Sequence, residues 1–142
     1  MLMQVDKKER KTPDPWNSRC PSRGVIDLLG DKWTLLLFPV LQKGARRNAE
    51  LLRSVDGISQ KVLTDTLRKL ESHGLVARHD YGTVPPKVDY RLTDLGLDLA
   101  KAISTLDHWV VAHYYEIAEA RERFRRRAQR KSPAVGQTRL SS

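Results

Sequence analysis

Residues whose side chains could bind another molecule gather on one face of a helix predicted over Ser59–His73. Its apolar face is formed by leucines at spacings of four and three residues, namely Leu63, Leu67 and Leu70. Ser59 can cap the start of this helix through its hydroxyl, and Gly74 can close its end. The other face carries polar side chains, most of which offer donors suited to base edges and phosphates: Gln60, Lys61, Thr64, Asp65, Arg68 and Ser72. A polar face is often only solvated, so the neighbouring segments decide its interpretation.

Two short strands are predicted directly after that helix, over Leu75–His79 and Val88–Leu92, joined by a loop that contains Gly82, Pro85 and Pro86. In the second strand, residues at 88, 90 and 92 should pack on the domain, and those at 87, 89 and 91 should face water. A basic helix followed by a hairpin is typical of winged-helix domains that read DNA. We therefore predict that the following residues contact double-stranded DNA: Arg47, Ser59, Gln60, Lys61, Thr64, Arg68, Lys69, Lys87 and Arg91. The charged residues of the hairpin could equally be solvated, and Asp80 and Asp89 weaken the positive field there.

The charge of this chain is unevenly distributed. Its 142 residues suffice for one domain with a modest core, and the formal net charge is +9. The segment Lys43–Lys69 holds seven basic residues against three acidic ones, which suits a polyanionic partner.

The single cysteine indicates a reducing compartment, so we expect the cytoplasm. No signal peptide is recognisable, and the longest apolar stretch, Leu35–Leu41, is too short to cross a membrane.

Composition divides the chain into three parts. We expect residues 1–19 to form a flexible arm, residues 20–120 the folded domain, and residues 121–142 a basic, partly disordered tail. Three further helices are predicted in the domain: one over Pro21–Leu29, one that starts after Asp31 and is kinked or ended by Pro39, and one over Asn48–Val55.

A long helix is predicted after Thr93, over about residues 94–120. Its apolar stripe continues past what a small domain needs for its own core, so we expect much of it to meet a second copy of the chain. The predicted homodimer interface consists of Trp16, Leu99, Ile103, Leu106, Trp109, Val110, Tyr114 and Ile117.

Cys20 is the one reactive side chain that needs an explanation. It lies between Arg19 and Pro21 at the start of a predicted helix, with Arg23 one turn further on. The helix dipole and the two guanidinium groups would favour its thiolate, although a lone cysteine can equally be a small buried hydrophobe. No metal-ligand spacing and no glycine-rich phosphate loop is found, so we expect neither a metal, a cofactor nor an enzyme.

Taken together, the motifs of residues Cys20 to about Ala118 resemble the HxlR family of bacterial and archaeal winged-helix transcriptional regulators, which is similar to the larger MarR group. The matching elements are Cys20-Pro21, Gly30–Trp33, Glu50-Leu51, Gly57–Ser59, Leu63-Thr64, Leu70–Val76, Pro85–Thr93 and Trp109. The resemblance implies a homodimer on an inverted repeat, with the Ser59 helix in the major groove and the hairpin as wing. It also implies that Cys20 senses oxidants or electrophiles. Two departures are Arg47-Asn48, where the family has an aromatic second residue, and Pro39 inside a helix that is normally continuous.

The expected fold is therefore mainly α with a small β-hairpin: a winged helix-turn-helix domain with terminal dimerisation helices. The expected function is that of a homodimeric transcriptional regulator, acting as a repressor by occlusion, whose partners are duplex DNA, a second copy and a small oxidant or electrophile. Two alternatives remain: a winged helix used as a protein-interaction module, and a ligand-responsive regulator in which Cys20 is structural. A small thiol peroxidase would need a resolving cysteine, which this chain lacks.

Overall fold

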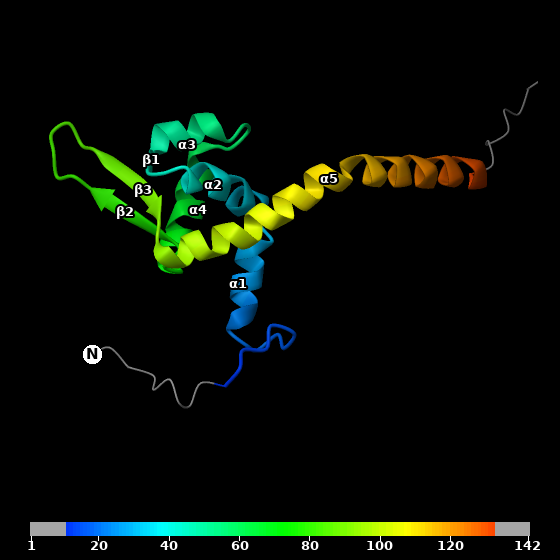
Figure 1. The fold of residues 1–142 in the computed structure, drawn as a ribbon, viewed down its shortest axis with the longest axis horizontal. Coiled ribbons are helices and arrows are strands. Elements are labelled where there is room, and N and C mark those ends of the chain that lie inside the picture. The colour runs from blue at the N-terminus through cyan, green and yellow to red at the C-terminus, as the bar shows by residue number, and fades with distance from the viewer. Residues whose placement is uncertain (1–10, 133–142) are drawn as a thin grey trace, which may run out of the picture. The chain divides into compact units, whose positions relative to one another are not determined.

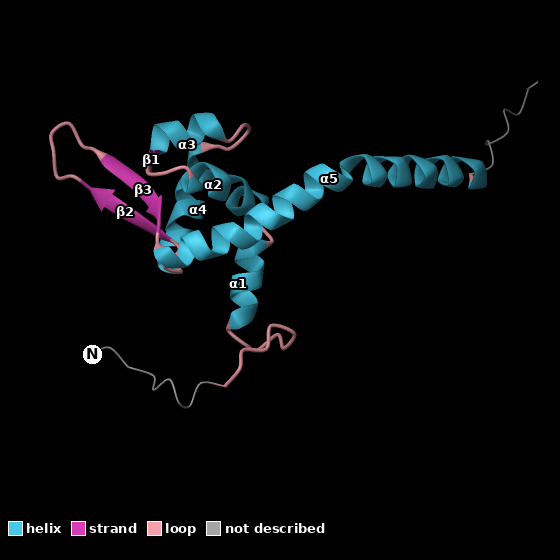
Figure 2. Ribbon diagram, viewed as in Figure 1, coloured by secondary structure: helices cyan, strands magenta, loops and turns pink. Residues whose placement is uncertain are grey.

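The computed structural model describes residues 11–132 and divides them into two units, one ending at Ile103 and the other starting at Ser104. The first unit contains four helices, α1 (Ser22–Leu29), α2 (Lys32–Gln42), α3 (Asn48–Ser54) and α4 (Gln60–Ser72), and three strands, β1 (Arg46–Arg47), β2 (Val76–Asp80) and β3 (Val88–Leu92). Helix α5 (Asp94–Lys131) starts in the first unit, and its remainder makes up the second. Figure 1 shows this order, and Figure 2 shows how small the sheet is beside the helices. The predicted fold class is confirmed.

The three strands form an antiparallel sheet in the order β1-β3-β2. Strands β2 and β3 make the predicted hairpin, with Val76 opposite Leu92 and Asp80 opposite Val88. Strand β1 was not predicted, because its two residues are too few to show a two-residue period. It pairs Arg46 with Tyr90 and Arg47 with Asp89, so β3 becomes the central strand.

The core of the first unit lies between the helices and the sheet. Its fully buried side chains come mainly from α2, α3 and α4, and they include the three predicted leucines of α4: Leu37, Phe38, Leu41, Leu51, Leu63, Leu67 and Leu70. Ala100 and Ile103 of α5 join the same core. Burying these side chains fixes the rotation of α4, so the polar face of α4 must point outward.

Side-chain caps set the starts of three helices at the predicted places. Asp31 accepts a hydrogen bond from the backbone N–H of Trp33 at 3.1 Å, and Thr93 accepts one from Gly96 at 3.1 Å. Ser59 accepts one from Val62 at 3.2 Å. Helix α4 ends at Ser72, and the chain turns away from it at Gly74, which has a φ of 70°, a conformation that residues with a Cβ rarely adopt. These local signals explain why the predicted bounds of α4 are confirmed.

Pro39 does not end the second helix, which was one of the two outcomes predicted for it. Helix α2 continues through Pro39 to Gln42. A proline removes one backbone hydrogen bond and costs roughly 3 kcal/mol in a helix interior. Leu37, Phe38 and Leu41 are almost completely buried around it, and this packing offsets the loss. Helix α3 likewise forms from Asn48 onward without an aromatic residue at that position.

Helix α5 extends beyond the predicted end of the domain. The residues expected to begin a partly disordered tail, from Arg121 to Lys131, are helical. Arginine, alanine and glutamate are good helix formers, and Glu122 pairs with Arg125 at 2.8 Å and with Arg126 at 3.1 Å, one turn further on. The prediction for residues 133–142, and that for residues 1–10 of the arm, falls outside the described residues. Within residues 11–132, no helix combines the length and the apolar character needed to cross a membrane.

Candidate nucleic-acid interface

The exposed face of α4 carries a row of polar side chains. Gln60, Lys61 and Arg68 are exposed, and Thr64 is half-buried between them. Gln60 donates its side-chain amide to the Thr64 hydroxyl at 3.1 Å, and that hydroxyl donates to the backbone carbonyl of Gln60 at 2.9 Å. These bonds hold both side chains along the first turns of the helix. Among the described residues, no hydrogen bond or ion pair engages the Lys61 or Arg68 side chain.

Ser59 stands at the start of this face, with its hydroxyl oxygen used as the helix cap. The turn before it contains Gly57, whose φ of 82° lets the chain reverse between α3 and α4. Helices α3 and α4 thus form the helix-turn-helix, with α4 as its second and more exposed member.

A groove of about 570 Å³ separates α4 from the sheet. Its lining comes from α4, β2 and β3: Thr64, Arg68, Glu71, Ser72, Arg78 and Tyr90. Arg78 and Tyr90 stand opposite each other in the register, so their side chains share one face of the hairpin. Neither residue was among the predicted DNA contacts. The two-residue period of the strands could have placed Arg78 beside α4, but only once the register was known.

The base of the wing is organised around Asp89. The prediction that Asp89 faces water is wrong, because the residue is only 6% exposed. Strand β3 is central, with Arg47 of β1 on one side of Asp89 and His79 of β2 on the other, so neither edge is open. The Tyr81 hydroxyl donates to Asp89 Oδ2 at 2.5 Å, and Arg91 donates to Asp89 Oδ1 at 3.2 Å.

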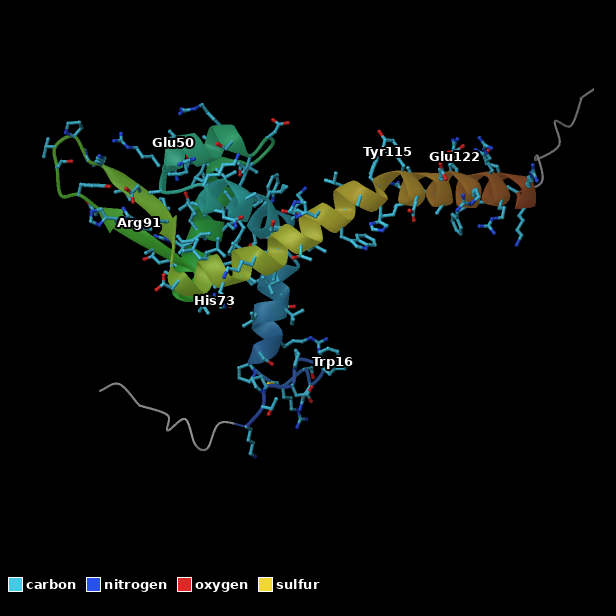
Figure 3. All side chains as sticks on the ribbon, viewed as in Figure 1. Trp16, Glu50, His73, Arg91, Tyr115 and Glu122 are labelled. Carbon is cyan, nitrogen blue, oxygen red and sulfur yellow. The ribbon has the colours of Figure 1, made fainter. Side chains whose placement is uncertain are left out.

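This hydrogen bonding shifts the titration of the cluster. The bond from Tyr81 lowers the pKa of Asp89 below its ordinary value, against the opposing effect of burial, and Arg91 adds to the lowering. The same bond raises the pKa of Tyr81. Lys87 lies with its Nζ atom 4.2 Å from the centre of the Tyr81 ring, a cation–π contact. Arg91 and Lys87, both predicted DNA contacts, are therefore held by partners within the wing; Figure 3 shows Arg91 on its strand.

Two other predicted DNA contacts lie apart from the exposed face of α4. Arg47 is exposed on β1, directly before α3. Lys69 lines a separate groove of about 330 Å³, together with Asp27, Asp31 and His73. Because two carboxylates share that groove with Lys69, its placement does not support grouping it with Lys61 and Arg68.

The predicted dimer residues fall into two groups. Ile103 is 4% exposed in the core of its own chain and Leu99 packs partly against that core, so the assignment of Ile103 to an interface is corrected. The other predicted dimer residues of α5 lie in the second unit and are between 41% and 58% exposed: Leu106, Trp109, Val110, Tyr114 and Ile117. Trp16 is 86% exposed in the loop before α1, where Figure 3 labels it.

Cys20 is a partly exposed free thiol. Its Sγ atom lies 3.1 Å from the Ser22 hydroxyl. Hydrogen bonds from the Ser22 hydroxyl and then from the Ser22 backbone lower the pKa of the Cys20 thiol, while burial and the Asp14 carboxylate oppose the shift. The direction of this shift agrees with the prediction, and so does the contribution of the helix start, because Ser22 is the first residue of α1. The predicted guanidinium groups do not contribute, and Arg23 instead donates to the Trp16 carbonyl at 3.4 Å.

No group of three or more histidine, cysteine, aspartate or glutamate side chains within residues 11–132 is arranged to hold a metal ion. The features of the described residues that bear on function are therefore a helix-turn-helix, a hairpin wing and, before α1, a partly exposed thiol. A helix-turn-helix followed by a hairpin defines a winged helix-turn-helix protein.

Comparison with known proteins specifies the family. The sequence model of the HxlR-like helix-turn-helix family matches residues 28–140, so the chain belongs to this family of transcriptional regulators. An HTH-type transcriptional regulator of Synechocystis is 45% identical over 80 residues, which are 56% of this chain and 59% of that protein, so the match spans about three fifths of that relative's length.

Solved structures agree with this assignment. The structure of YtfH from Salmonella typhimurium, described as a transcriptional regulator, matches with a TM-score of 0.74 and 32% identity, over 78% of this chain and 99% of that one. The redox regulator HypR in its reduced form matches with a TM-score of 0.65 and 34% identity, over 70% of this chain and 98% of that one.

Proposed function

We propose that this regulator binds duplex DNA sequence-specifically as a homodimer, with α4 in the major groove and the β2–β3 hairpin as the wing. The observation that carries the proposal is the outward face of α4, where the Lys61 and Arg68 side chains are free of partners among the described residues. Lysine and arginine are the side chains that most often bond guanine edges and phosphates. The capped, core-anchored helix presents them on a rigid support.

Basic residues concentrate in the same region. The segment Lys43–Lys69, which contains α3 and α4, has seven basic residues against three acidic ones. A winged helix used for protein interaction would need no such excess. We propose that the regulator represses transcription in the cytoplasm, because a protein bound at the operator occludes it.

A homodimer supports this mode of binding. Two copies related by a twofold axis place two recognition helices about 34 Å apart, one turn of duplex, which matches an inverted repeat. The exposed apolar residues of α5 in the second unit offer a surface for the second copy, since large exposed apolar patches favour association.

The test of DNA binding is a gel shift with Lys61→Ala. An operator is first selected from random duplexes with the wild-type protein. If Lys61 bonds a base edge, the variant loses roughly 1–3 kcal/mol on the operator and little on scrambled DNA. Lys32→Ala, at the start of α2, is the matched control, because it removes the same charge from outside the α4 face. Equal affinities of Lys61→Ala and wild type for the operator would exclude Lys61 from base recognition, and absence of wild-type binding to any duplex would exclude the function.

We further propose that Cys20 makes the regulator responsive to oxidants or electrophiles. Support comes from its partial exposure, its lowered pKa and the similarity of the chain to HypR, which is described as a redox regulator. The thiolate is the reactive form, and it can add to a quinone with formation of an S–C bond while a ring oxygen takes up a proton. Two Cys20 thiols can instead give two protons and two electrons to diamide and form a disulfide between subunits.

The test compares wild type, Cys20→Ser and Ser22→Ala on operator DNA, with and without benzoquinone or diamide. Wild type should release DNA and Cys20→Ser should not. Ser22→Ala should react more slowly near neutral pH, because loss of the Ser22 hydroxyl raises the pKa of the thiol and shifts the pH–rate profile upward. If Cys20→Ser responds like wild type, the thiol is structural and the signal enters elsewhere, as in a ligand-responsive regulator.

A further inference from the structure

The groove between α4 and the hairpin has two arginines on opposite walls. Arg68 projects from α4 and Arg78 from β2, and Tyr90 of β3 stands beside Arg78. The arginines of several other elements are neutralised within the chain, such as Arg91 by Asp89 and Arg125 by Glu122. Arg68 and Arg78, by contrast, make no ion pair with any residue that the structure describes.

Glu71 is the acidic member of the same groove. It lines the groove together with the two arginines, yet no ion pair joins it to either of them among residues 11–132. The groove therefore holds two unneutralised guanidinium groups against one carboxylate. Its net charge attracts an anion, and its volume of about 570 Å³ leaves room for one.

We infer that this groove takes the phosphate backbone of one DNA strand, gripped between Arg68 and Arg78. The inference rests on the DNA binding proposed above and assigns the contacts within it. The major groove of B-DNA, about 12 Å wide, and the minor groove, about 6 Å wide, are separated by a single phosphate backbone. With α4 in the major groove and the hairpin against the next minor groove, that backbone passes between α4 and β2.

Arginine suits this position because its planar guanidinium bonds two phosphate oxygens at once. The Tyr90 hydroxyl adds a donor on the same wall as Arg78. In this arrangement Arg68 positions the protein on the phosphate backbone. The base contacts are then made by the N-terminal turns of α4, which carry Gln60 and Lys61. This division agrees with the geometry of recognition helices, whose N-terminal residues contact base edges.

The experiment measures the affinity of the full-length protein for operator and scrambled duplexes over a range of salt. Arg78→Gln should weaken binding to both duplexes by the same factor, and Arg68→Gln should do likewise. Each should lower the slope of log affinity against log salt by about 0.9, so the loss at roughly 50 mM salt exceeds that at roughly 200 mM by about 3.5-fold. Glu71→Gln should strengthen binding to both duplexes, since it removes the repulsive charge. Arg78→Lys should restore the slope but only part of the affinity, because lysine keeps the charge without the planar fork.

Several results would overturn the inference that Arg68 and Arg78 hold the phosphate backbone, here called the clamp. One is an unchanged salt slope in Arg78→Gln; another is a loss in Arg68→Gln confined to the operator, which would make Arg68 a base-reading residue. Arg53→Gln at the end of α3 is the control for the loss of one charge, and thermal unfolding of each variant checks that the fold is kept. If wild-type protein binds neither duplex, the proposed function itself fails. If wild-type protein binds and Arg78→Gln has the same affinity and salt slope, only the clamp fails.

Discussion

Ser59 caps α4 at the end of the helix that we propose to enter DNA, and two substitutions separate its effect on stability from the effect of charge at that position. Its hydroxyl oxygen accepts a hydrogen bond from the Val62 backbone N–H at 3.2 Å and satisfies one of the free donors at the helix start. Ser59→Ala removes this acceptor, and loss of such a cap costs about 1 kcal/mol, within a range of roughly 0.5–2. For a domain of this size, that loss lowers the midpoint of thermal unfolding by about 4–8 °C.

Ser59→Asp keeps an acceptor at the same place. A carboxylate at a helix N-terminus is also favoured by the helix dipole, by about 0.3–1 kcal/mol. Its stability should therefore equal or exceed that of wild type. The added negative charge stands at the leading end of α4, so it should weaken binding to all duplexes, most strongly at low salt.

The assay combines urea and thermal unfolding with gel shifts at a temperature where all three proteins are folded. Ser59→Ala should be less stable than wild type but bind DNA better than Ser59→Asp, because it adds no negative charge. Ser59→Asp should be stable but bind poorly. A stability loss in Ser59→Asp as large as that in Ser59→Ala would show that the cap does not stabilise α4 as argued. Undiminished DNA binding by Ser59→Asp would show that the start of α4 lies away from the phosphates.

Four further predictions concern the fold and the assembly. The Thr34 hydroxyl is buried and, among the described residues, lacks a hydrogen-bond partner, so Thr34→Val should raise the free energy of unfolding by about 1 kcal/mol in urea titrations. Gly96→Ala should lower it by about 1–3 kcal/mol, because the new Cβ would overlap a backbone carbonyl, while Gly24→Ala in α1, where the Cβ meets nothing, should raise it slightly. The pKa of Asp89 is lowered in the folded protein, so its stabilisation is complete above the ordinary value of 3.8 and is lost as the pH falls through the lower folded value; the stability gap between wild type and Asp89→Asn should therefore narrow in acid. Trp109→Glu should halve the mass measured by analytical ultracentrifugation, and an unchanged mass would move the dimer interface away from this part of α5.

Local signals made helix α4 predictable. The spacing of Leu63, Leu67 and Leu70, the hydroxyl of Ser59 and the glycine at 74 all act within four residues of the backbone they control. The same holds for the hairpin, where the alternation in Val88–Leu92 and the prolines of the loop are sequence-local. Because each signal acts over a few residues, these elements could be predicted without knowledge of the tertiary packing.

Other features depend on neighbours that are distant in sequence. Pro39 is tolerated because Leu37 and Phe38 are buried by other elements, and such burial is not visible in a local rule for proline. Ile103 belongs to the chain's own core, because the first turns of α5 pack against other elements of the first unit. The sequence spacing of apolar residues does not show whether they are buried in their own chain or against a partner.

The sequence alone determined the family, the order of the elements and the polar face of α4, because periodicity, caps and motifs are encoded in adjacent residues. Only the tertiary structure decided which charges on that surface are free. Strand β1 covers the open side of β3, and this burial turns Asp89 from a solvated residue into the partner of Tyr81 and Arg91. The register of β2 against β3 places Arg78 across a groove from Arg68. These two arginines are ten positions apart in the sequence and belong to two different elements. Charge pairing depends on distance in space, and only the folded chain sets those distances.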